Sequence, residues 1–215
     1  MAERNFGYIP SVMDGTEHVF AARNVGDLPE EYSFRPYMAP IIDQGYLSIC
    51  VPCSVSAYLN WKENLKDGNA EDNKIALMDI YNSKTTEGDG MTFKDALHYL
   101  RHNGVESKDG NLSIKSYGLV RSVVGLQYAL ILNGPCVGAL RVYSDCPNFW
   151  DSNTGTFLGC HAISIVGYDE KGFIIRNSWG ENWGEKGFFR ILRGENECNI
   201  ETMGDCARIE KVPRM

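Results

Sequence analysis

The feature that most constrains the fold of this 215-residue chain is a change in its hydrophobic pattern near Leu112. Before this point, apolar residues recur at the three- and four-residue spacing of amphipathic helices. After it, short β-branched apolar runs alternate with glycine and Asn/Asp turns, as in an antiparallel barrel. The chain is therefore expected to have an α+β fold, with a mainly helical part followed by a β part.

The pattern also predicts the individual elements. Thr92 and Asp95 form a capping pair at one helix start, and Asn103-Gly104 ends that helix. We expect helices at 50–65, 75–81, 92–101 and 123–132, and strands at 113–120, 137–143, 161–168, 172–177 and 187–192.

A cysteine stands at the start of the first predicted helix. Cys50 would lie at the positive end of the helix dipole, which favours a thiolate over a thiol. Pro52 suits the first helical turn, where its missing N–H would have no partner anyway. Gln44 lies six residues upstream, across a turn at Gly45, and can bring an amide donor back toward a developing oxyanion. Cys50 is therefore a candidate nucleophile.

The second half of the chain supplies a base and a residue to orient it. His161 opens an apolar, β-branched run that reads as a buried strand, and Asn177 ends the next such run. An asparagine amide oxygen accepts a hydrogen bond from one imidazole N–H and fixes the tautomer of the ring. Cysteine, histidine and asparagine in this order make a nucleophile, a base and an orienting group.

These segments resemble the motifs of the papain family of cysteine peptidases. Residues 43–54 resemble its nucleophile motif, residues 161–168 its histidine motif and residues 177–188 its asparagine motif. Shorter matches occur at 28–30, 134–135 and 193–201, so the likeness covers roughly residues 28–205. One motif alone would be weak, but three in the right order are specific.

The resemblance implies a two-lobed papain-like fold, with one mainly helical lobe, one antiparallel β-barrel lobe and an active-site cleft between them. It implies a peptidase domain over residues 28–215, preceded by an N-terminal leader over residues 1–27. The helical lobe would take about residues 43–111. The β lobe would take about residues 112–215, together with the crossing segment 28–42.

The resemblance also implies a cysteine endopeptidase. A Cys50 thiolate paired with a His161 imidazolium would attack a peptide carbonyl, with Asn177 orienting His161 and Gln44 in the oxyanion hole. No metal or organic cofactor is expected. The implied substrate-binding residues are Gly90, Met91, Ala139, Gly159, Cys160, Trp183 and Met203.

Three of these residues are expected to set specificity. Met203 occupies the position that closes the second subsite in the family, and Ala139 and Gly159 would form its walls. The resemblance therefore implies a preference for an apolar residue two positions before the cleaved bond.

The chain departs from the family pattern around the nucleophile. Leu47, Ser48 and Ile49 replace the usual cysteine, glycine and serine before it, and Val51 replaces the tryptophan after it. The glycine-rich substrate motif is reduced to residues 88–91. No cysteine lies between Cys53 and Cys136, so the usual bridges of the helical lobe cannot form. These departures resemble the disulfide-poor bacterial and viral branches of the family.

Composition narrows the partners and the compartment. The net charge of −7 and the lack of a Lys/Arg cluster argue against a nucleic-acid partner. No apolar run approaches the ~20 residues that span a bilayer, and the first residues do not form a signal peptide. We expect a monomeric, cytoplasmic peptidase from a bacterial or viral source, acting on peptides or proteins.

Seven cysteines, an odd number, are most simply explained by a mostly reduced chain. The resemblance leaves a bridge between Cys146 and Cys198 open, because a cysteine near Cys198 is often paired in the family.

Residues 1–27 are too short and irregular for the helical propeptide typical of papain-like zymogens. We hypothesise that this leader covers part of the cleft or its back face. The alternative is a disordered tail.

Other functions remain open at this stage. Cys50-Val51-Pro52-Cys53 is a C-x-x-C motif like that of thioredoxin-like redox proteins, but no βαβ pattern precedes it. Ser48 and Ile49 would line the cleft beside the nucleophile, which keeps alive a catalytically impaired fold that binds a peptide or a partner. Acyl transfer or hydrolysis at a non-peptide amide would use the same catalytic residues.

Overall fold

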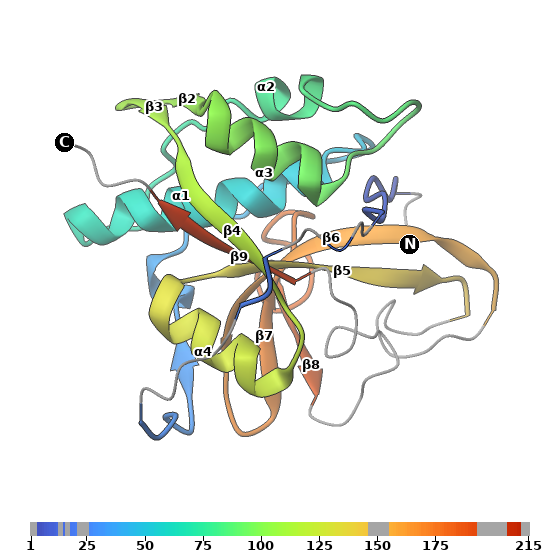
Figure 1. Cartoon of the computed structure of the whole chain (residues 1–215). Helices are drawn as coiled ribbons and strands as arrows, with labels where there is room; N and C mark the ends of the chain where they lie inside the picture. The colour runs from blue at the N-terminus through green and yellow to red at the C-terminus, as the bar shows by residue number, and fades with distance from the viewer. Residues whose placement is uncertain are drawn as a thin grey trace.

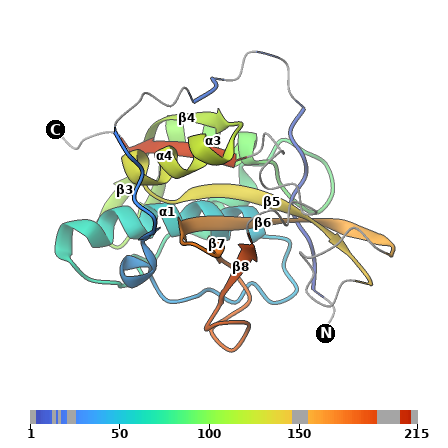
Figure 2. The ribbon, with the colours of Figure 1, turned by 90° about the horizontal axis from the view of Figure 1, so that it is seen from below.

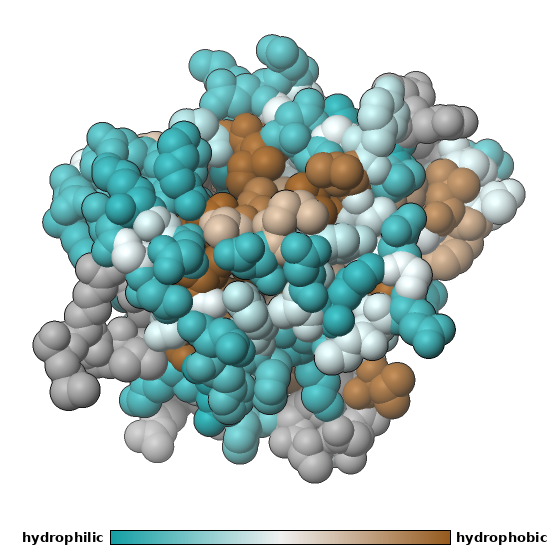
Figure 3. Space-filling model, turned by 90° about the horizontal axis from the view of Figure 1, so that it is seen from above, coloured by the Kyte–Doolittle hydropathy of each residue, from teal (hydrophilic) through white to brown (hydrophobic). Residues whose placement is uncertain are grey.

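A computed structural model describes residues 4–12, 15, 18–20, 26–145 and 155–192, and the backbone of the strand 206–211. The helical lobe comprises α1 (Cys50–Asp67), α2 (Leu77–Asn82) and α3 (Phe93–His102), with the short hairpin of β2 (Val105–Ser107) and β3 (Gly110–Leu112). These elements lie together at the top of Figure 1. Seen from above, this face is mainly hydrophilic (Figure 3).

The β lobe is built on one antiparallel sheet with the strand order β4-β9-β5-β6-β7-β8, and β1 pairs with β6. Helix α4 (Val123–Asn133) belongs to the same half of the molecule (Figure 1), where it packs on β4, β5, β6 and β9. Figure 2 shows the β lobe from below. A 3₁₀ turn, η1, covers Arg35–Tyr37. The strands are β1 (Tyr32–Ser33), β4 (Ile114–Val120), β5 (Cys136–Tyr143), β6 (Phe157–Tyr168), β7 (Gly172–Arg176), β8 (Phe188–Leu192) and β9 (Cys206–Lys211).

Helix α1 holds the two lobes together. Every residue from Cys50 to Trp61 is buried, because one side of the helix packs on α2 and α3 and another on β5 and β6. The Ser164 hydroxyl of β6 donates to the Ser54 carbonyl of α1 across 3.1 Å. The helix ends at Gly68, whose φ of 65° is the left-handed conformation that glycine adopts without strain.

The crossing segment is fixed by a buried charge. Arg176, at the end of β7, is 3% exposed and donates to the carbonyls of Ala39 and Pro40, each across 2.8 Å. The backbone of residues 42–44 then pairs with that of residues 178–180. This pairing brings the segment before the nucleophile helix beside the segment after β7.

The predicted helices and strands agree with the structure in kind, with shifts at their ends. Thr92 caps α3 as expected, since its side chain accepts from the Asp95 N–H. One expectation needs correction: β6 begins at Phe157, so His161 lies inside this strand and not at its head. Within the described ranges, no helix is long and apolar enough to cross a bilayer.

Candidate active site

Cys50 is the first residue of α1 and is fully buried, with 0% of its surface exposed. No side chain caps this helix start, so the first backbone N–H groups remain available as donors. The backbone of Ala162, the residue after His161, hydrogen-bonds to the Cys50 sulfur. The thiol therefore lies at the junction of the two lobes, beside β6.

His161 and Asn177 are joined by a hydrogen bond. His161 Nε2 and Asn177 Oδ1 are 2.7 Å apart, and both side chains are buried. The register of β6 and β7, with Ser164 opposite Arg176, brings the two residues together. Asn177 Oδ1 also accepts from the Ser178 N–H across 2.8 Å. Because an amide oxygen only accepts, His161 Nε2 carries the hydrogen and Nδ1 carries the lone pair of the neutral ring.

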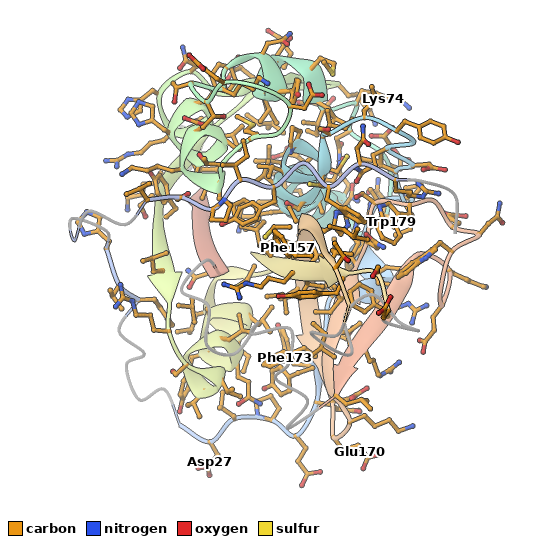
Figure 4. All side chains as sticks on the ribbon, turned by 90° about the vertical axis from the view of Figure 1, so that its right-hand side faces the viewer. Asp27, Lys74, Phe157, Glu170, Phe173 and Trp179 are labelled. Atoms are coloured by element: carbon orange, nitrogen blue, oxygen red, sulfur yellow. The ribbon has the colours of Figure 1, made fainter. Side chains whose placement is uncertain are left out.

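An aromatic wall covers this pair. The Trp179 ring lies 4.8 Å from the His161 ring, and Trp183 packs edge-on against Trp179 at 5.1 Å. Trp179 is 4% exposed and lies at the boundary between the lobes in Figure 4. Excluding water from the His161–Asn177 hydrogen bond strengthens it.

Gln44 is brought to the same site from the crossing segment. Its backbone N–H donates to the Ser178 carbonyl across 2.9 Å, and its side-chain Oε1 accepts from Ser178 Oγ across 2.5 Å. Its Nε2 donates to the carbonyl of Leu47 across 2.8 Å and to that of Asn5 across 3.4 Å. The amide is held with its donor group facing the N-terminal segment.

That N-terminal segment, residues 4–9, lies across the site and is called the leader strand below. Its trace crosses Figure 4 between the helical lobe above and the β lobe below, near Trp179. The Met91 N–H donates to the Gly7 carbonyl (2.8 Å), the Ile9 N–H donates to the Met91 carbonyl (3.0 Å), and the Tyr8 N–H donates to the Cys160 carbonyl (3.1 Å). The leader strand thus pairs with both lobes at once.

Side chains reinforce these backbone bonds. Phe6 packs against the rings of His161 (6.1 Å) and Trp179 (6.4 Å), and Tyr8 packs against Phe93 (4.9 Å). Arg4 forms an ion pair with Asp43 at 2.7 Å and lies over the Trp179 ring. The Gly7 backbone hydrogen-bonds to the Cys50 sulfur.

Burial beneath the leader strand sets the protonation of the pair. Desolvation raises the pKa of Cys50 to about 11, against backbone hydrogen bonds that lower it. Desolvation lowers the pKa of His161 to about 4, against the hydrogen bond that His161 donates to Asn177, which raises it. Both shifts disfavour the thiolate–imidazolium ion pair while the site is covered.

The predicted substrate-binding residues lie in several places. Met91 and Cys160 bond to the leader strand through their backbones, and a Cβ on Gly90 would lie 2.8 Å from the Gly7 carbonyl oxygen. Gly159 lies against Phe6. Ala139 is buried opposite Ala162 in the β5–β6 pairing, and Trp183 packs behind Trp179. Met203 lies outside the described residues, as do Cys146 and Cys198.

Sequence reasoning missed Ser178 and the contacting residues of the leader strand. Ser178 directly follows Asn177, and nothing in the sequence indicated that its side chain contacts Gln44. The run Phe6-Gly7-Tyr8 places a glycine between two aromatic residues. Two aromatic residues around a glycine indicate a segment whose side chains pack and whose backbone lies close to a neighbour. This pattern was the only sequence sign of the contacts that these residues make.

A thiol at a helix start, a histidine bonded to an asparagine on adjacent strands, and a glutamine amide on the crossing segment define a papain-like cysteine protease site. The model of the papain family cysteine proteases matches residues 67–207, which is more than half of the chain. The chain belongs to this family. The matched range includes His161 and Asn177 and begins after Cys50.

Relatives and solved structures agree. The chain is 36% identical over 104 residues to a gut-specific cysteine proteinase of Caenorhabditis elegans, covering 45% of this chain and 32% of that protein. It is 38% identical over 104 residues to cathepsin B-like cysteine proteinase 3 of Ostertagia ostertagi, covering 45% of this chain and 60% of that protein. These matches therefore span between a third and three-fifths of the relatives' lengths.

The fold is shared with two solved proteases. Xylellain, a cysteine protease from Xylella fastidiosa, superposes with a TM-score of 0.80 at 22% identity, covering 99% of each chain. A procathepsin B from Trypanosoma congolense superposes with a TM-score of 0.78 at 20% identity, covering 97% of this chain and 87% of that one.

Proposed function

We propose that this chain is a cysteine endopeptidase that hydrolyses peptide bonds of peptide or protein substrates. The observation that carries the proposal is the 2.7 Å bond between His161 and Asn177 beside a thiol at the start of α1. Membership of the papain family supports the same chemistry.

In the proposed reaction, the Cys50 sulfur attacks the substrate carbonyl carbon and its proton passes to His161. The Gln44 Nε2 group and the Cys50 backbone N–H stabilise the oxyanion. His161 then protonates the leaving amine, and in the second half of the reaction it removes a proton from the water that attacks the thioester. Asn177 keeps the imidazole in the orientation that both transfers need.

We also propose that residues 1–27 act as a leader that blocks this site. A substrate aligned for attack places a carbonyl carbon next to the Cys50 sulfur. The leader strand instead places the Gly7 backbone there, as a hydrogen-bond partner of the sulfur. It also takes up the Met91 and Cys160 backbone groups. These are the groups from which a substrate strand would gain its own backbone bonds, so the two compete.

The protonation of the covered site supports the same proposal. The shifts that burial imposes on Cys50 and His161 both disfavour the thiolate–imidazolium pair. When the leader strand leaves, water reaches both groups and the desolvation that caused the shifts is relieved. Release of the leader strand would therefore activate the nucleophile as well as uncover it.

For specificity, we propose an apolar second subsite with walls from Ala139 and Gly159 and with Met203 closing it. Beside this region, the Tyr8 ring packs against Phe93 at 4.9 Å while the Tyr8 backbone bonds to the Cys160 carbonyl, so an aromatic side chain is already accommodated in the covered site. We further propose a cytoplasmic monomer without nucleic-acid or membrane partners. The thiols at Cys50, Cys53, Cys136 and Cys160 suit a reducing compartment.

The test combines covalent labelling with turnover. The full chain and its Gly7→Ala variant, in which the leader strand should be displaced, are treated with a papain-class epoxide and assayed on fluorogenic peptides at pH 5 to 8. Cys50→Ser serves as the inactive control, and His161→Ala tests the base.

We expect Cys50-specific labelling and peptide cleavage that are weak in the full chain, strong in Gly7→Ala and absent in Cys50→Ser. His161→Ala should remove the labelling at mildly acidic pH. If neither the full chain nor Gly7→Ala is labelled or cleaves peptides, the peptidase proposal fails, and a peptide- or partner-binding module takes its place.

A further inference from the structure

Cys53 has no role in the mechanism above, yet it lies beside the nucleophile. It is the fourth residue of α1, is 5% exposed and carries a free thiol. It lines a small cavity between the lobes together with Ala162 and Arg176. Ala162 is also the residue whose backbone hydrogen-bonds to Cys50. The two thiols therefore flank the same point of β6.

The positions of the two cysteines suit a covalent link. Residues three apart in an α-helix lie on the same face with Cα atoms about 5 Å apart, given the radius and rise of the helix. Disulfides form at Cα separations of roughly 4.4–6.8 Å. A link between Cys50 and Cys53 thus needs side-chain rotation within the first helical turn, without movement of one lobe against the other.

Arg176 places a positive charge at the same cavity as Cys53. Its guanidinium is 3% exposed and donates to two backbone carbonyls, which are neutral acceptors. Burial and the neighbouring Cys50 raise the pKa of Cys53, and the positive charge of Arg176 lowers it by a smaller amount. The cation therefore opposes part of this shift and stabilises the negative charge that develops on Cys53 as it attacks another sulfur.

We propose that Cys50 and Cys53 are a redox pair, in which Cys53 resolves oxidised Cys50 into a reversible intrahelical disulfide that inactivates and protects the nucleophile. The oxidant is a hydroperoxide or a small disulfide such as oxidised glutathione. The proposal rests on the proposed function in one respect, that Cys50 is a reactive thiol.

The steps balance with hydrogen peroxide as the oxidant. The Cys50 sulfur attacks one peroxide oxygen, the O–O bond breaks, and a sulfenic acid and one water result. The Cys53 sulfur then attacks the Cys50 sulfur as its thiol loses a proton, the S–O bond breaks, and the leaving hydroxide takes up that proton as a second water. The two thiols lose two electrons in total, and the peroxide gains them. Without Cys53, further peroxide would carry Cys50 to the irreversible sulfinic acid.

The experiment uses the reduced full chain in two treatments. One is brief exposure to hydrogen peroxide, and the other is long equilibration in a glutathione redox buffer, which captures the linkage even if opening of the site is slow. Free thiols are alkylated in acid, and the peptide that holds both cysteines is weighed before and after dithiothreitol. Cys53→Ser is the test variant, and Cys136→Ser, at another buried cysteine, is the matched control.

We expect the wild-type peptide to lose about 2 Da, the mass of two hydrogens, and to regain it with dithiothreitol together with epoxide labelling of Cys50. Cys136→Ser should behave alike. Cys53→Ser should instead gain two oxygen atoms at Cys50 and stay unreactive after reduction. If Cys53→Ser does not fold, Cys53→Ala takes its place. The mass change of the wild-type peptide tests for the linkage without any variant.

The proposal is overturned if the wild-type chain shows no linkage in either treatment, or if Cys53→Ser recovers as fully as wild type. Its failure is distinguishable from failure of the proposed function. A chain that forms the linkage but cleaves no peptide would support the redox pair and overturn the peptidase proposal. A chain that cleaves peptides but forms no linkage would support the peptidase proposal and overturn the redox pair.

Discussion

Gly7 of the leader strand lies so close to Ser48 that a Cβ built on Gly7 would fall 2.2 Å from the Ser48 carbonyl oxygen. The neighbouring Ser48 carbon and Cα would lie 2.5 and 2.7 Å away, and all three are backbone atoms. Rotation of a side chain cannot relieve such contacts. The fit of the leader strand over Cys50 therefore depends on the absence of a side chain at residue 7.

This relationship predicts that Gly7→Ala releases the leader strand. The alanine methyl would clash with backbone on the opposite wall, so the closed state should be destabilised and Cys50 should react faster with iodoacetamide near neutral pH. Mass spectrometry of the labelled chain measures the rate. Val12→Ala, at a position 84% exposed, is the matched control and should leave the rate unchanged. Equal rates in Gly7→Ala and wild type would contradict the prediction.

The oxyanion role of Gln44 predicts a loss of turnover in Gln44→Ala. Removing one oxyanion donor typically lowers kcat by about 100- to 1,000-fold. Ser178→Ala should have a smaller effect of the same kind, because Ser178 Oγ holds the Gln44 amide by its Oε1. Both losses should fall on kcat more than on KM in steady-state assays of the activated chain. A change confined to KM would indicate that Gln44 only binds substrate.

The pKa shifts predict that the closed state is most stable between about pH 6.5 and 9. Burial lowers the pKa of His161 from its ordinary value of 6.5 to about 4, so a state that exposes the ring to water binds protons more readily than the closed state, and acid favours opening. Burial raises the pKa of Cys50 from its ordinary value of 9.0 to about 11, so a state that exposes the thiol loses its proton more readily, and alkali also favours opening.

Hydrogen exchange of residues 4–12, corrected for intrinsic rates, measures this opening. Protection of the Tyr8 and Ile9 amides, which bond to Cys160 and Met91, should fall as the pH drops from 6.5 toward 4. The His161→Ala variant lacks the titrating group and should lose this acid limb. The same fall in both proteins would assign the effect to another group.

The proposed second subsite predicts a preference for apolar residues two positions before the cleaved bond. Ala139→Leu would narrow this subsite and should reduce kcat/KM for an aromatic residue there, relative to alanine, by about tenfold or more. A peptide library screened against the activated wild-type chain and this variant tests the expectation. A charged preference in the wild-type chain would contradict it.

Much of the fold was predictable because its elements have strong local signals. The amphipathic period and Thr92 cap of α3 and the apolar runs of β5 to β8 all lie in short stretches of sequence. The strands β1, β2, β3 and β9 were not predicted. β1 and β9 depend on pairing with residues far along the chain, as Tyr32 does with Tyr168. β2 and β3 have only three residues each, and such short strands show no readable period.

At the site, the sequence indicated which residues take part, but it did not indicate how deeply they are buried or which residues they contact. Cys50, His161, Asn177 and Gln44 each stand in a motif with a chemical order. The pKa shifts of the pair could not be read from the sequence, because they follow from burial, which is a tertiary property. Phe6 and Tyr8 could be seen as aromatic, but their places against His161 and Phe93 could not.

The leader strand and the cleft it fills belong to one chain, and this has a consequence for how inhibition would respond to concentration. A tethered segment has an effective local concentration on the order of mM for short flexible connections, which does not change when the protein is diluted. Dilution would therefore not activate the enzyme, and a substrate would have to outcompete a ligand that is always present. Cutting the connection would convert that ligand into a free peptide, which dilution then removes.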